Sequence, residues 1–157
     1  MTDVVALAAE LLAIESPTGA EGPAVDFVTR WLVARGWNVH VQEVSGGRGN
    51  VWASRAGGGV AMSTHLDTVP PYVRPVLEGS QLKWRGACDA KGIAAAMMAA
   101  ADRLATEGEE RVDLLLVVGE EKGSDGARAA RPRTRPIRSS APRRSSRCSS
   151  CCRRSRR

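Results

Sequence analysis

Residues 112–121 read Val-Asp-Leu-Leu-Leu-Val-Val-Gly-Glu-Glu, an apolar run that stops at a glycine and two acidic side chains. A run of this length and composition is typical of a strand buried in the middle of a sheet. A shorter apolar run at residues 60–63 (Val-Ala-Met-Ser) stops in a similar way, at Thr-His-Leu-Asp in residues 64–67. Ligands of open α/β sheets bind beyond the carboxyl ends of the strands, so these two strand ends are the first candidates for a functional site.

The segments around the two runs alternate between helical and extended patterns. Apolar residues at helical spacing predict three helices, and turn residues separate several short extended segments. The predicted helices cover about residues 2–14, 23–35 and 93–106, and the predicted strands and hairpin cover 37–44, 51–54, 60–63, 73–84 and 112–118. This order predicts an α/β fold, a three-layer sandwich with a largely parallel sheet.

The charge of the chain divides sharply near residue 126. The 157 residues contain 17 acidic and 23 basic side chains, and all of the acidic ones fall in residues 1–126, which carry a net charge of −6. Residues 127–157 carry 12 arginines and no acid, or +12. The basic isoelectric point therefore describes neither segment, and it gives no ground for classifying residues 1–126 as a basic protein.

The amino-terminal residues show no targeting pattern. No basic segment precedes the first apolar residues, and Glu10 and Glu15 interrupt the stretch. We therefore expect neither a signal peptide nor a membrane span, and we predict a cytoplasmic protein. Three of the four cysteines lie in the basic tail, so we expect no disulfide framework.

Nitrogen and oxygen donors recur at the predicted strand and helix ends. His65 and Asp67 follow one strand, Glu120 and Glu121 follow another, and Asp89 precedes the alanine-rich helix. Each has a common alternative: a capped turn, a solvated acidic face, or an acid at a helix N-terminus. Their order and their placement at element ends favour a site for a divalent cation such as zinc, cobalt or manganese.

Three motifs in order carry a resemblance to a known family. They are residues 64–70 (THLDTVP), 85–92 (RGACDAKG) and 119–126 (GEEKGSDG). Together they resemble the motifs of the M20 metallopeptidase family, over about residues 1–128. Within that family, the residues of these motifs are similar to those of the acetylornithine and acetyl-lysine deacetylases. They are also similar to those of the lysine-biosynthetic hydrolase that releases lysine or ornithine from an amino-group carrier protein.

The resemblance implies a role for each donor. It implies two divalent ions, zinc or cobalt, with His65 on one ion, Glu121 on the other and Asp89 bridging them. Asp67 would hydrogen-bond the far nitrogen of His65, and Glu120 would be the general base that moves a proton from water to the leaving amine. The two adjacent glutamates would point opposite ways along an extended chain.

The resemblance also implies a substrate class and a partner. We expect a hydrolase that cleaves an N-acyl amide of a basic amino acid, in lysine or arginine biosynthesis. The substrate would be a small N-acyl amino acid or an amino-group carrier protein. Residues 1–126 would be the amino-terminal part of the M20 catalytic domain, an incomplete sheet, and the family's dimerisation domain would be absent.

Residues 127–157 depart from this pattern. They contain 12 Arg, 7 Ser and 3 Cys with one large aliphatic residue, so we predict a disordered Arg/Ser-rich tail. We attribute it to a frameshift near codon 128 and expect this chain to be inactive, since no Asp, Glu or His follows Asp125. The alternative is a non-catalytic chain whose tail binds nucleic acid non-specifically. The tail has no aromatic residue for base stacking, which argues against that alternative.

Overall fold

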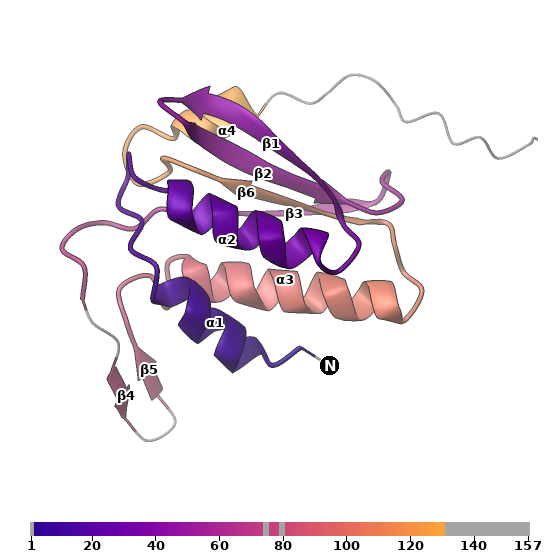
Figure 1. The fold of residues 1–157 in the computed structure, drawn as a ribbon, viewed down its shortest axis with the longest axis horizontal. Helices are drawn as coiled ribbons and strands as arrows, with labels where there is room; N and C mark the ends of the chain where they lie inside the picture. The colour runs from indigo at the N-terminus through magenta and orange to yellow at the C-terminus, as the bar shows by residue number, and fades with distance from the viewer. Residues whose placement is uncertain (1, 74–75, 79–80, 131–157) are drawn as a thin grey trace, which may run out of the picture.

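The computed structural model describes residues 2–73, 76–78 and 81–130 (Figure 1). Helices and strands fall close to the predicted ranges, so the α/β class is confirmed. In chain order they are α1 (Val4–Leu12), α2 (Gly22–Val33), β1 (Asn38–Ser45), β2 (Arg48–Ser54), β3 (Val60–His65), β4 (Val76–Glu78), β5 (Gln81–Lys83), α3 (Lys91–Thr106), β6 (Val112–Val117) and α4 (Asp125–Ala129). The last helix carries the fold three residues past the predicted boundary at residue 126.

The main sheet is mixed. Its strand order is β1-β2-β6-β3, in which β3 and β6 are parallel while β1 and β2, and β2 and β6, are antiparallel. The prediction of a largely parallel sheet is therefore wrong for two of the three pairings. For β1 and β2 the reason is their connection: Gly46 and Gly47 both have positive φ, which permits a tight two-residue hairpin and forces an antiparallel pair.

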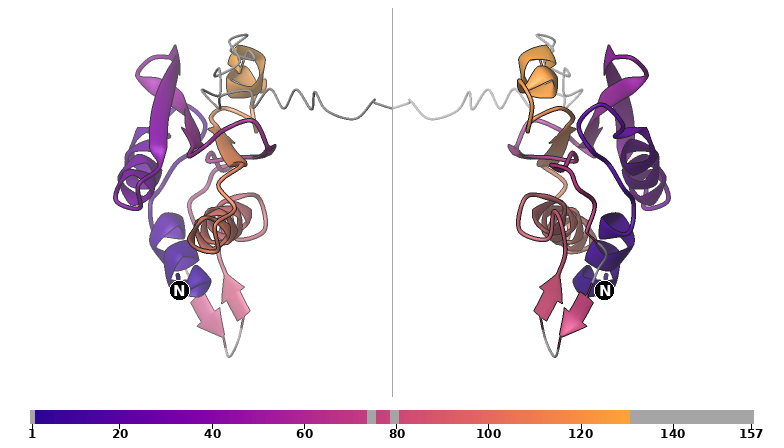
Figure 2. Two further views of the ribbon diagram at one scale, coloured as in Figure 1. Left: turned by 90° about the vertical axis from the view of Figure 1, so that its right-hand side faces the viewer. Right: turned by 90° about the vertical axis from the view of Figure 1, so that its left-hand side faces the viewer.

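The helices α1, α2 and α3 share one face of this sheet, and Figures 1 and 2 show them together below the strands, with α4 above. On the covered face, Val51, Leu114 and Leu116 are fully buried and join the three helices in a single core. On the other face, Trp52 and Leu115 stay half-buried. Within the described residues the fold thus has two layers over most of the sheet, and the predicted third layer is represented only by α4.

The parallel pair places two chain segments at one edge of the sheet. His65, the last residue of β3, is paired in register with Val117, the last residue of β6. The chain therefore leaves both strands at the same end. α3 also begins at this end, at Lys91, whose buried ammonium donates to the carbonyl of Ile14.

Two further predictions concern the Arg/Ser-rich tail and the expected lack of a membrane span. From residue 131 onward, the Arg/Ser-rich tail lies outside the described residues, and so does the nucleic-acid alternative that depends on it. In the part of the chain that the structure describes, no helix combines the length and apolarity needed to cross a bilayer.

Candidate metal centre

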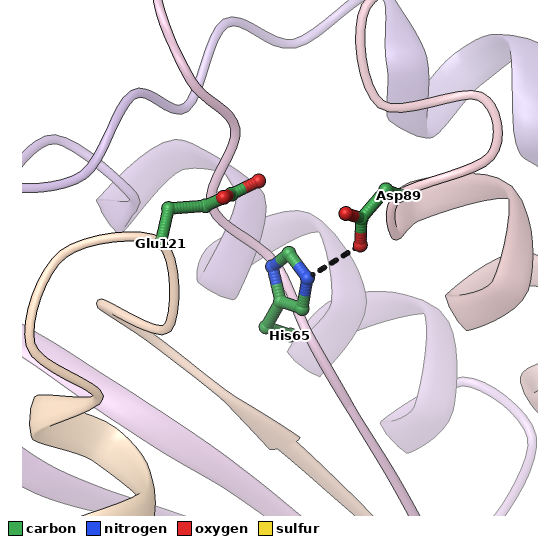
Figure 3. Close-up of side chains that lie close together, drawn as sticks. All are labelled: His65, Asp89 and Glu121. Atoms are coloured by element: carbon green, nitrogen blue, oxygen red, sulfur yellow. Dashed lines mark hydrogen bonds and ion pairs between the residues drawn. The ribbon is translucent and has the colours of Figure 1, made fainter.

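Three of the predicted ligands converge at the edge where β3 and β6 end. One donor atom each from His65, Asp89 and Glu121 lie within 4.8 Å of one another. Figure 3 shows the three side chains approaching from separate segments, with the imidazole between the two carboxylates. The sequence separations are 24 and 32 residues, so the fold and not local chain geometry brings them together.

Each of the three donors lies at or close to the end of a strand or a helix. His65 is the last residue of β3, and Glu121 lies in the turn that follows β6. Asp89 lies two residues before α3, and its carboxylate is 75% exposed. A nitrogen and two carboxylate oxygens at this spacing form a donor set that zinc and cobalt accept, so the residues present fit a divalent cation.

The imidazole of His65 is buried between two carboxylates. Its Nδ1 lies 3.0 Å from the carbonyl oxygen of Asp67 and 3.3 Å from the Asp67 carboxylate, and its Nε2 lies 2.9 Å from Asp89 Oδ1. The hydrogen bond that the His65 ring donates to the Asp67 carboxylate raises the pKa of His65 to about 9, against an opposing effect of burial. A donor role for Nδ1 toward Asp67 leaves Nε2 as the atom that faces the other ligands.

Asp67 connects the imidazole to the acidic turn. Its carboxylate is fully buried and accepts hydrogen bonds from Thr18 Oγ1 at 2.8 Å and from the backbone N–H groups of Glu120 and Glu121 at 3.0 Å each. Burial alone would raise the pKa of Asp67, but the bonds from His65, Thr18 and the two amides outweigh it and lower the pKa to about 2. Asp67 is thus an anion that orients both a ligand and the residues beside it.

Glu120 and Glu121 lie in a turn over residues 120–123, not in the extended chain that the sequence suggested. The extended prediction is wrong because β6 ends at Val117 and the next residues fold back, with the amides of Glu120 and Glu121 donating to the Asp67 carboxylate. The turn still separates the two side chains: Glu121 joins the ligand cluster, while Glu120 is 47% exposed with Oε2 at 3.7 Å from His65 Nε2. Burial raises the pKa of Glu121, and the nearby carboxylates add to that effect.

A pocket of about 300 Å³ opens beside the cluster. Asp89 and Glu121 line it together with apolar and basic groups contributed by Trp84 and Arg85. The remaining lining residues are Val69, Gly86 and Cys88. A molecule in this pocket would lie against the two carboxylates.

Several buried polar side chains around the site were not found by sequence reasoning. Glu21 and Asn50 are fully buried, and each bonds to the backbone of residues 118–126: Glu21 accepts from Gly119 N at 3.0 Å, and Asn50 bonds to Val118 N and Gly126 O. Thr18 lies between the predicted helices at 2–14 and 23–35, and the sequence assigns it no role. No local signal marks these residues, because each contact joins positions at least 49 residues apart.

The chain matches one protein-family model. The model describes peptidase family M20/M25/M40 and matches residues 61–140. This range contains all three motifs quoted above and all three converging donors.

Curated relatives are similar over about three quarters of the chain. A peptidase M20 domain-containing protein of Schizosaccharomyces pombe is 38% identical over 128 residues, covering 76% of this chain and 32% of that protein. A probable carboxypeptidase of Aspergillus clavatus is 37% identical over 136 residues, with coverages of 76% and 30%. A putative LysW-lysine/LysW-ornithine hydrolase of Pyrococcus abyssi is 37% identical over 122 residues, with coverages of 76% and 34%. The chain spans about a third of the length of these relatives.

Solved structures share the fold. Aminopeptidase PepT from Bacillus cereus superposes with a TM-score of 0.68 at 25% identity, covering 82% of this chain and 39% of that one. The YXEP protein of Bacillus subtilis, described as a dinuclear metal binding peptidase of the M20 family, superposes with a TM-score of 0.62 at 18% identity, with coverages of 80% and 37%. The incomplete sheet predicted from the sequence agrees with this partial coverage.

Proposed function

Because the chain belongs to peptidase family M20/M25/M40, we propose that its described residues form the amino-terminal part of a metal-dependent hydrolase that cleaves amide bonds. One observation supports this most directly: donor atoms of His65, Asp89 and Glu121 lie within 4.8 Å of one another at the ends of β3 and β6. A histidine, an aspartate and a glutamate that converge where two strands end, in a family of peptidases, favour a catalytic site over a purely structural acidic cluster.

Two divalent ions, zinc or cobalt, would be held with His65 on one ion, Glu121 on the other and Asp89 shared. When bound, such ions polarise the amide carbonyl and lower the pKa of water from 15.7 to about 7. The chain's own contribution is to aim the donors. His65 is fixed through Nδ1 by Asp67, so its Nε2 is the atom that faces Asp89.

Glu120 is the group that we assign to proton transfer. Its backbone N–H is held by Asp67, yet its carboxylate is half-exposed and lies 3.7 Å from His65 Nε2, outside the set of three ligands. A carboxylate that lies beside the ions but does not coordinate them can accept a proton from water and deliver it to the departing amine. Glu120 therefore acts as general base and then as general acid.

For the substrate we propose an N-acyl amide of a basic amino acid. The LysW-lysine/LysW-ornithine hydrolase of Pyrococcus abyssi supports a lysine or ornithine amide, either as a small N-acyl amino acid or attached to an amino-group carrier protein. We propose accordingly that the reaction belongs to lysine or arginine biosynthesis and takes place in the cytoplasm. A peptide carboxyl terminus is the second candidate, since the Aspergillus clavatus relative named a probable carboxypeptidase is equally identical to this chain.

The 157-residue chain by itself should be a weak catalyst. Catalytic zinc sites use three protein ligands for each ion, whereas the converging cluster among the described residues supplies three in all for the two proposed ions. We attribute the tail to a frameshift and propose that residues 1–126 are the amino-terminal part of an M20-type catalytic domain.

The test is turnover with and without metal. The purified chain is incubated with Co²⁺ and either N-acetyl-lysine, N-acetyl-ornithine or a carboxypeptidase peptide, and release of the free amino acid is followed. We expect slow, chelator-sensitive release from the acetylated basic amino acids, and a loss of about 10²- to 10⁴-fold in Glu120→Gln with Co²⁺ affinity retained. Glu43→Gln, on exposed strand β1, is the matched control. Release that survives the chelator, or that is unchanged in Glu120→Gln, would contradict the assignment.

A further inference from the structure

The turn that carries Glu120 and Glu121 is held at both ends by a buried ion pair from elsewhere in the chain. We propose that this pair, Glu21 and Arg48, positions the Glu120–Glu121 turn and thereby sets the metal affinity of the site, although neither residue touches an ion. The inference rests on the metal site proposed above, and it assigns a positioning role to two residues outside the ligand cluster.

Glu21 holds the start of the turn. Its side chain is 0% exposed, and Oε1 accepts a hydrogen bond from Gly119 N at 3.0 Å and faces Arg48 Nη1 at 3.3 Å. Its other oxygen, Oε2, accepts from Gly19 N at 3.0 Å. Glu21 precedes α2 but makes no side-chain cap bond to that helix. Its carboxylate accepts hydrogen bonds from the turn and from the loop before α2 instead.

Arg48 contacts the chain at the other end of the turn. Its Nη2 donates to Ser45 Oγ at 2.7 Å and lies 3.5 Å from Asp125 Oδ2, the residue that begins α4. The planar guanidinium thus spans Glu21 on one side and Asp125 on the other. The Arg48 side chain is 13% exposed and that of Glu21 0%, so the contact between these two is shielded from water and from salt, whereas Asp125 is 46% exposed.

Gly119 shows how closely the pair is fitted to the turn. Its φ is +67°, a conformation that glycine adopts without strain, and a Cβ there would lie 3.1 Å from Arg48 Nη1. The chain therefore turns directly against the guanidinium before it presents Glu120 and Glu121.

The carboxylate of Glu21 is fully buried, and its partners are Arg48 and the two amides of Gly19 and Gly119. Glu21→Gln removes the charge that faces Arg48 Nη1 and leaves a single oxygen for the amides of Gly19 and Gly119. Gly119 lies two residues before the ligand Glu121. Residues that orient metal ligands typically alter metal affinity ten- to hundredfold when replaced. We expect a change of that size here.

The experiment is a Co²⁺ titration of the full 157-residue chain, with the visible absorption spectrum of bound Co²⁺ and the circular dichroism of the metal-free protein recorded in parallel. Glu21→Gln keeps the shape of the side chain and removes its charge. Arg48→Lys keeps the charge but cannot span Glu21 and Asp125 together. Glu107→Gln, an exposed partner of Arg103 on α3, is the control.

We expect Glu21→Gln to raise the Kd for Co²⁺ ten- to hundredfold and to change the Co²⁺ spectrum, with the metal-free fold retained. Arg48→Lys should raise the Kd by less, and Glu107→Gln should stay within twofold of the unsubstituted chain. A Kd within twofold and an unchanged spectrum in Glu21→Gln would overturn the proposal. If Glu21→Gln does not fold, the same criterion applied to Arg48→Lys decides. Absence of Co²⁺ binding in the unsubstituted chain overturns the metal site itself, whereas normal binding with unaffected variants overturns only the positioning role.

Discussion

Replacement of Asp67 by Asn tests whether one buried anion organises the site. The substitution preserves the shape of the side chain and removes its charge. In the native chain that carboxylate faces His65 Nδ1 at 3.3 Å and accepts bonds from Thr18 and from the amides of Glu120 and Glu121. An amide offers a single oxygen, so it leaves some of these donors without an acceptor.

The size of the effect on His65 follows from its pKa. The pKa is about 9 in the metal-free fold against 6.5 for an unperturbed imidazole, and Asp67 is its largest cause. A raised pKa stabilises the fold fully below pH 6.5, and this stability is lost as the pH rises toward 9. Between pH 6 and pH 8 the free energy of unfolding of the metal-free chain should therefore fall by about 2 kcal/mol. In Asp67→Asn this decrease should largely disappear.

The substitution should also lower stability at pH 6. The pKa of Asp67 is about 2 against an ordinary 3.8, so its charged form is favoured by the fold. This stability is present above pH 3.8 and is lost as the pH falls toward 2. Asn cannot supply it, and buried donors left unpaired add to the cost, so we expect a loss on the order of 2–4 kcal/mol.

The assay combines urea unfolding at pH 6 and pH 8 with a proton NMR titration of the imidazoles. The chain has two histidines, His65 and His40, and His40 is exposed on β1. Asp26→Asn, at an exposed position of α2, is the control variant. The reasoning is refuted if the pKa of His65 stays near 9 in Asp67→Asn, or if the two proteins lose the same stability between pH 6 and pH 8.

Three further changes test other parts of the structure. The affinity for Co²⁺ should rise about tenfold per pH unit from pH 7 toward pH 9 and then level off, because His65 must lose a proton to bind; a pH-independent Kd from calorimetry would contradict this. Gly126→Ala should destabilise the chain by roughly 1–3 kcal/mol in urea unfolding, since a Cβ would meet Val118 O at 2.3 Å; an unchanged midpoint would count against the close approach. Leu116→Ala, on the covered face of the sheet, should cost about 2–5 kcal/mol and clearly more than Leu115→Ala on the opposite face, and equal losses would refute the two-layer assignment.

The sequence predicted the parts of the fold that depend on local patterns. The apolar run at 112–118 identified the central strand, and the polar residues after the two strands identified three donors that the structure brings together. The antiparallel pairing of β2 with β6 escaped prediction, because nothing in either strand specifies a partner about 60 residues away. The alternation of helices and strands suggested parallel pairing, and the short Gly46–Gly47 turn overrode it.

The polar side chains that surround the donors were the part of the site hardest to predict from the sequence. Glu21 lies just before a predicted helix and Arg48 between two predicted strands, and only the folded chain shows that they meet at Gly119. Contacts between residues 27 to 98 positions apart leave no periodic or spacing signal in a single sequence. The motifs therefore predicted the three donors that converge and Asp67 beside His65, but not the Glu21–Arg48 pair at the turn.

Crystals of the chain grown with Co²⁺, with diffraction recorded at the cobalt absorption edge, test the central claim most directly. The account predicts an anomalous peak about 2.0–2.2 Å from His65 Nε2 and from a carboxylate oxygen of Asp89 or Glu121. A fully loaded crystal with no peak at this edge of the sheet, or with cobalt bound only at other residues, would contradict it.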